Sequence, residues 1–307
     1  MPVTVKKVHT FTGHYGSVYA LQPADNPSEF FSASGDGMVV KWSLTHPDEG
    51  ELIARLPNSV YALHYHTPSG LLIAGQNFEG IHLLDWKNKK EVGSLKLHNT
   101  AIFDLQTAGN RLFCGTGNGT LFVIDLNTLT VLDALTCSSK NLRSLSVNEK
   151  TNELAAGYSD NLIRIFDMET LTLKYEIPAH TNSVFTVRYM PGRNYLLSGS
   201  RDARLKAWNM KTGYTLAGEV VAHLFAINHL DFSPDLKHFV TCSLDKSIKI
   251  WDATEMRLLK VIDKGRHAGH GTSVNRVLWT THNNRLLSAS DDRTISVWDI
   301  TIQDDAR

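Results

Sequence analysis

The chain has no excess of charge of either sign and no long apolar run. Its 307 residues include 31 Lys and Arg against 31 Asp and Glu, so the formal net charge is zero. Because binding to nucleic acid or to an anionic membrane depends mainly on Lys and Arg, this balance disfavours both partners and leaves only a local basic patch open. No apolar stretch approaches the roughly 18 residues of a membrane span, and residues 1–7 lack the apolar core of a signal peptide.

Cysteine is scarce. Cys114, Cys137 and Cys242 are odd in number, widely spaced and free of any CxxC pair, which is typical of a reducing compartment. A globular chain of this length can bury about three quarters of its unfolded surface, so it needs no disulfide. We therefore predict a soluble, cytoplasmic protein.

Motifs of phosphate binding, serine hydrolysis and zinc proteolysis are also missing, since GxxxxGK, GxSxG and HExxH do not occur. The glycine-rich run 115–119 is better explained as a turn between strands than as a phosphate loop. The chain has 14 histidines. Several of them recur at one position of a repeated unit, which indicates a structural role for them and not metal binding. We predict no cofactor and no metal site.

Self-similarity is what the sequence does contain. Four segments are copies of one unit: SASGDGMVVKWSL (32–44), SGSRDARLKAWNM (198–210), TCSLDKSIKIWDA (241–253) and SASDDRTISVWDI (288–300). Weaker copies lie between them, and the Trp or its replacement falls at positions 42, 84, 124, 166, 208, 251 and 298. Seven units of about 42 residues account for nearly the whole chain, which predicts one domain over 1–307 in place of two.

Within each unit, short runs of alternating apolar residues end at Gly, Asn, Asp or Pro. This alternation, as in Ile248-Lys249-Ile250-Trp251, predicts strands and no long helices, with about four strands per unit.

A second regularity is more specific. In four units a His precedes a Ser by 20 residues, an Asp by 22 and a Trp by 28. The sets are His14, Ser34, Asp36 and Trp42; His180, Ser200, Asp202 and Trp208; His223, Ser243, Asp245 and Trp251; His270, Ser290, Asp292 and Trp298. With Gly13-His14, Gly269-His270 and the Trp-Asp pairs at 251–252 and 298–299, the chain over about residues 3–300 resembles the WD40 repeat family.

The resemblance implies an all-β, seven-bladed propeller of four-stranded antiparallel blades. It also implies that the His, Ser, Asp and Trp of each set form a buried hydrogen-bond network. A Ser-His-Asp triad is the competing interpretation, but fourfold repetition favours a scaffold role, because an active site is needed only once.

The two ends of the chain are expected to close the ring. Only nine residues follow Trp298, too few for a turn and a full outer strand. Residues 3–11 precede His14 where other units have an outer strand, so we predict that this N-terminal strand completes the last blade.

Units 2 to 4 depart from the pattern, and we expect them to be the less rigid sector. Unit 2 has Gln76, Phe78 and Leu84; unit 3 has His98, Thr116, Asn118 and Ile124; unit 4 has Tyr158, Asp160 and Phe166.

Function in such a ring is expected at the exposed loops. In the family, partners commonly bind the top face through residues three and five after the structural His and through the residue before the structural Asp. Carried onto this chain, these positions supply the candidate protein-binding residues Tyr19, Tyr61, Phe103, Arg143, Phe185, Arg201, Asn228 and Asn275. We call Tyr19, Tyr61, Phe103 and Phe185 the aromatic crescent; the alternative is that these side chains only fill the channel.

These residues predict a non-catalytic scaffold that binds a protein or peptide segment on the top face, as a monomeric propeller within a larger complex. Two alternatives stay open: a propeller enzyme or small-ligand binder acting at the channel mouth, and an adaptor subunit in a nucleic-acid-processing complex. The first would need convergent carboxylates or histidines, and Asp291 is the only carboxylate among the expected top positions.

Overall fold

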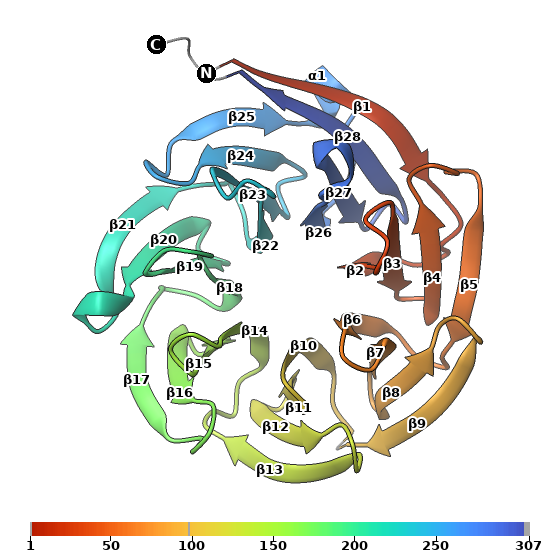
Figure 1. The fold of residues 1–307 in the computed structure, drawn as a ribbon. Coiled ribbons are helices and arrows are strands. Elements are labelled where there is room, and N and C mark those ends of the chain that lie inside the picture. The colour runs from red at the N-terminus through yellow and green to blue at the C-terminus, as the bar shows by residue number, and fades with distance from the viewer. Residues whose placement is uncertain (1, 98, 304–307) are drawn as a thin grey trace.

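Seven four-stranded antiparallel sheets stand around a central axis (Figure 1) in the computed structural model, which describes residues 2–97 and 99–303. The predicted seven-bladed, all-β propeller is confirmed. His98, the expected network residue of unit 3, lies outside the described residues.

Each blade runs from an inner strand at the axis to an outer strand at the rim. Blade 1 is β2 (Val18–Pro23), β3 (Glu29–Ser34), β4 (Met38–Ser43) and β5 (Gly50–Arg55). Blade 2 is β6 (Val60–His66), β7 (Leu71–Gln76), β8 (Gly80–Asp85) and β9 (Lys90–Lys96). Blade 3 is β10 (Ile102–Ala108), β11 (Arg111–Thr116), β12 (Thr120–Asp125) and β13 (Thr130–Thr136).

Blades 4 to 6 follow the same order. Blade 4 is β14 (Leu142–Asn148), β15 (Glu153–Tyr158), β16 (Leu162–Asp167) and β17 (Leu173–Pro178). Blade 5 is β18 (Val184–Tyr189), β19 (Tyr195–Ser200), β20 (Arg204–Asn209) and β21 (Thr215–Val221). Blade 6 is β22 (Ile227–Phe232), β23 (His238–Ser243), β24 (Ile248–Asp252) and β25 (Leu258–Ile262).

Blade 7 combines both ends of the chain: β26 (Val274–Trp279), β27 (Arg285–Ser290), β28 (Ile295–Ile302) and, outermost, β1 (Val3–Phe11). Three short helical segments interrupt the connections: η1 (Met210–Thr212), α1 (Lys264–His267) and η2 (His282–Asn284). With at most four residues each, none of these described helices could cross a bilayer.

The hydrophobic core lies between the blades, in seven clusters that each join two neighbours. The cluster between blades 1 and 2, for example, packs Phe31 and Val39 against Val60 and Leu72. Strand alternation produces this arrangement, because each sheet has two faces and each face meets the next blade. No blade can therefore bury its apolar surface without its neighbours.

The ring closes as the sequence predicts. β1 pairs antiparallel with β28 from Val3–Ile302 to Phe11–Ile295, and Figure 1 shows the two strands side by side. Phe11 is buried and packs against Phe30 and Trp42 of blade 1, with ring centroids 5.3 and 5.1 Å away. The N-terminal strand thus completes blade 7 and also contributes to the contact between blades 7 and 1.

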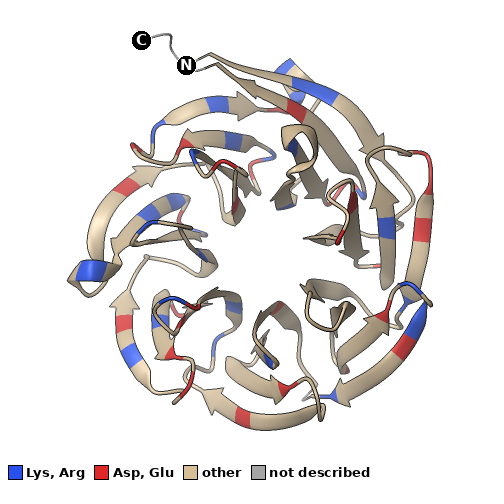
Figure 2. Cartoon of the chain, in the orientation of Figure 1, with Lys and Arg blue, Asp and Glu red and all other residues tan. Residues whose placement is uncertain are grey.

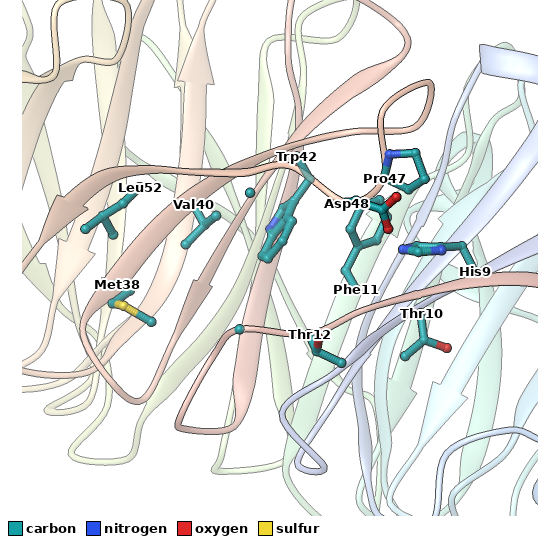
Figure 3. A pocket seen from close by; sticks show the side chains of 12 residues that line it. His9, Thr10, Phe11, Thr12, Met38, Val40, Trp42, Pro47, Asp48 and Leu52 are labelled. Carbon is teal, nitrogen blue, oxygen red and sulfur yellow. The ribbon is translucent and has the colours of Figure 1, made fainter.

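The contact between blades 7 and 1 is not fully filled. A cavity of about 370 Å³ lies beside β1, and Figure 3 shows Phe11 and Trp42 close to Pro47 around it. Phe11 is the one residue of β1 in the buried core cluster of this seam, so it supplies the strand's main apolar anchor to blade 1.

Removing residues 1–12 should lower the melting temperature by at least several degrees, because blade 7 loses its outer strand and blade 1 loses Phe11. Phe11→Ala alone should destabilise by about 3–5 kcal/mol. Lys6→Ala, an exposed position on the same strand, is the matched control and should change little. Thermal unfolding followed by circular dichroism measures all three, and an unchanged melting temperature on deletion would refute closure by β1.

Candidate functional site

A buried hydrogen-bond network recurs in blades 1, 5, 6 and 7. In blade 1, Trp42 Nε1 donates to Ser32 Oγ at 2.7 Å, Ser32 Oγ lies 2.8 Å from His14 Nε2, and His14 Nδ1 lies 3.1 Å from Asp36 Oδ2. Asp36 also accepts from the backbone N–H groups of Tyr15 and Met38, at 2.8 Å each. The network therefore ties the loop before the inner strand to the turn between the second and third strands.

The hydroxyl in this network differs from the sequence-based expectation. It comes from Ser32, Ser198, Thr241 and Ser288, each two residues before the predicted Ser34, Ser200, Ser243 and Ser290. Trp42 pairs with Phe30 across β3 and β4, so Ser32 is its diagonal neighbour, whereas Ser34 lies four positions along β3.

The predicted serines instead hold the turn. Ser200 Oγ accepts from the Asp202 N–H at 3.1 Å and donates to the carbonyl of Asn182 at 3.1 Å. Ser243 makes the equivalent bonds, and Ser290 accepts from the Asp292 N–H but donates to the carbonyl of Ser273, one residue further along. Neither set of hydroxyls suits a nucleophile, because the serines of both sets, and Thr241, are fully buried.

Hydrogen bonds and burial together determine the protonation states of the network residues. Burial alone would raise the pKa of Asp245, but hydrogen bonds from His223, Ser247 and the Leu224 N–H hold it well below its ordinary value. Burial lowers the pKa of His14 and of His223, and this outweighs the opposing effect of their carboxylates. Both histidines are thus neutral at neutral pH, with the proton on the nitrogen that faces Asp.

Blades 3 and 4 carry local contacts at the turn between the second and third strands, among the described residues. In blade 3, Asn118 Oδ1 accepts from Thr116 Oγ1 at 2.7 Å within the turn. In blade 4, the Arg164 guanidinium pairs with Asp160 at 2.9 Å and lies over the Tyr158 ring, 4.6 Å from its centroid. Neither arrangement contains the Trp–hydroxyl–His link.

Asp245→Ala should cost about 1–3 kcal/mol of unfolding free energy, because it removes the carboxylate acceptor of buried His223 and leaves its Nδ1 only the Ser247 hydroxyl, 3.2 Å away. Asn118→Ala, at the corresponding but exposed position of blade 3, should cost clearly less. Urea unfolding of the two variants makes the comparison, and equal destabilisation would contradict the distinction between the two kinds of blade.

The innermost strand of every blade carries a bulge at one equivalent position, which is the fifth residue after the structural His in the blades that have this His. The ladder passes from Val18–Ser34 to Ala20–Ala33 and skips Tyr19, and it skips the corresponding residue in the other six blades. The seven skipped residues are Tyr19, Tyr61, Phe103, Arg143, Phe185, Asn228 and Asn275. A bulged residue leaves the ladder and its side chain is re-aimed.

All seven bulged residues line one cavity of about 500 Å³ at the channel mouth. Tyr19 meets Tyr61 edge to face at a centroid distance of 4.6 Å, and Tyr61 stacks on Phe103 at 5.9 Å. Arg143 lies between two rings, with its guanidinium carbon 4.7 Å from the centroids of both Phe103 and Phe185. The aromatic crescent and Arg143 thus form one continuous surface.

Arg201 lies outside the cavity lining and is exposed. Burial lowers the pKa of Arg143, and the charge of Arg201 lowers it further, so the two cations influence each other. Arg143 Nε donates to Ser159 Oγ at 3.0 Å, and in the described part of the chain neither arginine has a carboxylate partner. The local charge at this side of the mouth is therefore positive.

The two asparagines on the opposite side connect blades. Asn228 Nδ2 donates to the carbonyl of Val274 at 2.8 Å, and Asn275 Nδ2 donates to the carbonyl of Val18 at 3.1 Å and to Asp291 at 2.8 Å. The amides of both asparagines are thus engaged by neighbouring blades, whereas the aromatic side chains of the crescent line the cavity.

Sequence reasoning missed an apolar ridge on blade 6. Leu224, Phe225 and Leu244 are 82%, 57% and 49% exposed. Leu224 and Phe225 follow the structural His223, and Leu244 precedes the structural Asp245, so all three occupy loop positions. Large apolar residues at loop positions are the sequence feature that could have predicted this ridge. The Leu244 N–H donates to the carbonyl of Ala226 at 3.0 Å, which brings the two loops together.

Polar side chains deeper in the channel were also missed. They satisfy edge N–H groups of the next blade: Ser144 Oγ accepts from Val187, Asp104 Oδ2 from Leu145, and Asp231 Oδ2 from Trp279, at 2.8–3.1 Å. The sequence pattern that could have identified these side chains is a polar residue on each side of an aliphatic one within the inner strands. No group of three or more His, Cys, Asp or Glu side chains among the described residues is placed to hold a metal ion.

His64 in this region should make stability depend on pH. Burial, and then the charges of His66, Arg188 and Arg276, lower its pKa from the ordinary range of histidine to about 4. The unfolded chain therefore binds the proton first, so stability is present above pH 6.5 and is lost as pH falls toward 4. When the pH is lowered from 7.5 to 5.5, the free energy of unfolding of His64→Gln should fall by about 1 kcal/mol less than that of the unmutated protein, as measured by urea unfolding. An equal fall in both proteins would show that His64 does not contribute.

Comparison with known proteins agrees with this geometry. The family model "WD domain, G-beta repeat" matches residues 5–43, 171–209, 214–252 and 263–299, about half of the chain. Mouse WD repeat-containing protein 1 is 24% identical over 86% of this chain and 45% of its own length. Dictyostelium discoideum protein tipD is 22% identical over 97% and 49%. Nuclear distribution protein PAC1 of Arthroderma benhamiae is 28% identical over 55% and 38%. The chain thus spans less than half of the length of these relatives.

Proposed function

This chain belongs to the WD40 repeat family, and from that premise we propose that it is a non-catalytic scaffold that binds an extended segment of another protein across its top face. The seven bulges carry the proposal. They remove one residue per blade from the sheet and direct it to a common cavity, and four of the seven are large aromatic side chains. Aromatic residues and Arg dominate the energetics of protein interfaces.

The partner segment should combine an acidic residue with apolar ones. Arg143 and Arg201 are without carboxylate partners among the described residues, and Lys246 is exposed next to Leu244. A carboxylate at the mouth would satisfy the arginines, while apolar side chains would cover the aromatic crescent and the apolar ridge.

Catalysis at the mouth has less support. Asp291, the one carboxylate expected there, accepts a hydrogen bond from Asn275, and the network hydroxyls are buried. A role as a nucleic-acid adaptor has less support too, because the charges balance and Figure 2 shows both signs interspersed along the outer strands. We also propose a cytoplasmic, monomeric propeller, which the three free cysteines support.

Selection of peptides from a random displayed library against the purified protein tests the proposal. Enriched peptides should carry Asp or Glu beside apolar residues. Their affinity should fall at least tenfold in Tyr61→Ala/Phe103→Ala/Phe185→Ala, because central aromatic anchors each contribute about 1 kcal/mol or more. Equal affinity for that variant would refute top-face binding.

Two further proteins sharpen the result. Arg143→Gln/Arg201→Gln should select peptides without the acidic preference, since the carboxylate loses both of its cations. Leu132→Ala removes an exposed apolar side chain from the outer strand β13 and is the matched control, which should bind as the unmutated protein does.

A further inference from the structure

A second cavity, of about 200 Å³, lies deeper in the channel than the mouth. Six of the seven blades contribute to it, and its lining is polar where the mouth is aromatic. Its polar side chains are Gln22, His64, Gln106, Arg188, His229, Asp231 and Arg276. Arg276 also lines the mouth cavity, so it stands between the two.

Two guanidinium groups face this cavity without protein acceptors. Among the described residues, neither Arg188 nor Arg276 makes a side-chain hydrogen bond or an ion pair within 4 Å. Burial lowers the pKa of Arg276, and the charge of Arg188 acts in the same direction, against Asp104 and Asp231. Both arginines are half-buried. A guanidinium carries five N–H donors in a fixed plane, and here these donors are left to water or to a bound ligand.

The nearby carboxylates are committed elsewhere. Asp231 Oδ2 accepts from the Trp279 N–H at 2.8 Å, and Asp104 Oδ2 accepts from the Leu145 N–H at 2.8 Å. Both bonds connect adjacent blades. These acids therefore moderate the positive charge at a distance but do not occupy the donors of the two arginines.

The remaining polar groups suit an anion. His229 is almost fully buried, and its Nδ1 has no hydrogen-bond partner within the described part of the chain. Burial and the charges of Arg276 and Arg188 hold the pKa of His229 well below its ordinary value, against a hydrogen bond to the Val277 backbone, so the ring is neutral and its single N–H is shared with that backbone. The amides of Gln22 and Gln106 add further donors.

We propose that this cavity binds a small oxyanion, of the phosphate or carboxylate type, between Arg188 and Arg276. The planar guanidinium fork matches both kinds of oxyanion with paired hydrogen bonds. The volume sets the size, because it lies below the roughly 300 Å³ at which pockets for drug-sized molecules begin. The site is distinct from the aromatic crescent and does not depend on the proposed peptide binding.

Isothermal titration calorimetry with inorganic phosphate and, separately, with succinate tests the site, with chloride holding the ionic strength constant. At least one anion should bind saturably at one site per chain, and the one that binds identifies a phosphate-type or carboxylate-type ligand. Arg188→Gln should weaken that binding about tenfold or more, because one charged partner is lost.

Arg55→Gln is the matched control, since it removes an equally charged but exposed side chain at the end of β5 and should leave binding unchanged. Should Arg188→Gln not fold, Arg188→Lys keeps the charge but loses the planar fork and should weaken binding at least threefold. Unsaturable heats with both anions, or the same affinity in the unmutated protein and the Arg188 variants, would overturn the proposal. No peptide enters the titration, so its outcome is independent of the top-face experiments.

Discussion

Each innermost strand has one edge that no neighbouring strand covers, and the seven free edges converge on the channel. Their N–H groups still need acceptors, because an unpaired buried donor is costly. Side chains of the preceding blade supply them: Ser144 and Ser146 cap Val187 and Tyr189, while Asp104 and Asp231 cap the next blades in the same way. These serines and aspartates therefore lie in the channel for a structural reason, because they cap strand edges that close around one axis, whereas among the described residues Arg188 and Arg276 cap none.

The bulge acts on the same strands at their other end. It interrupts the pairing after the first residue of the strand, and it releases one side chain toward the mouth before the pairing resumes. In blades 1, 5, 6 and 7 the buried His–Asp link holds the adjoining loop on the turn between the second and third strands, so the released side chain projects from a fixed base. Rigid support beneath variable residues is the arrangement that lowers the entropy cost of binding.

Differences among blades, and not the repeated features, distinguish the two cavities. Blades 1, 2, 3 and 5 present rings at the bulge, blade 4 presents Arg143, and blades 6 and 7 use asparagines that bond across to the next blade. Deeper in the channel, arginines from blades 5 and 7 meet histidines from blades 2 and 6. One ring thus separates an aromatic surface from a cationic one, with Arg276 between them.

The repeat, the blade count and the closure by residues 3–11 could be predicted from the sequence alone, because they follow from spacings within one unit or from a strand missing at one end. The candidate residues at the mouth came from the resemblance to the WD40 family, and their bulges appear only in the folded sheets. The folded structure was also needed to show that Ser32 and not Ser34 meets Trp42, because the choice depends on diagonal contact across two strands. It alone placed Arg143 between Phe103 and Phe185 and gathered Arg188, His229 and Arg276. These residues lie on different blades, and their proximity exists only after the ring has closed.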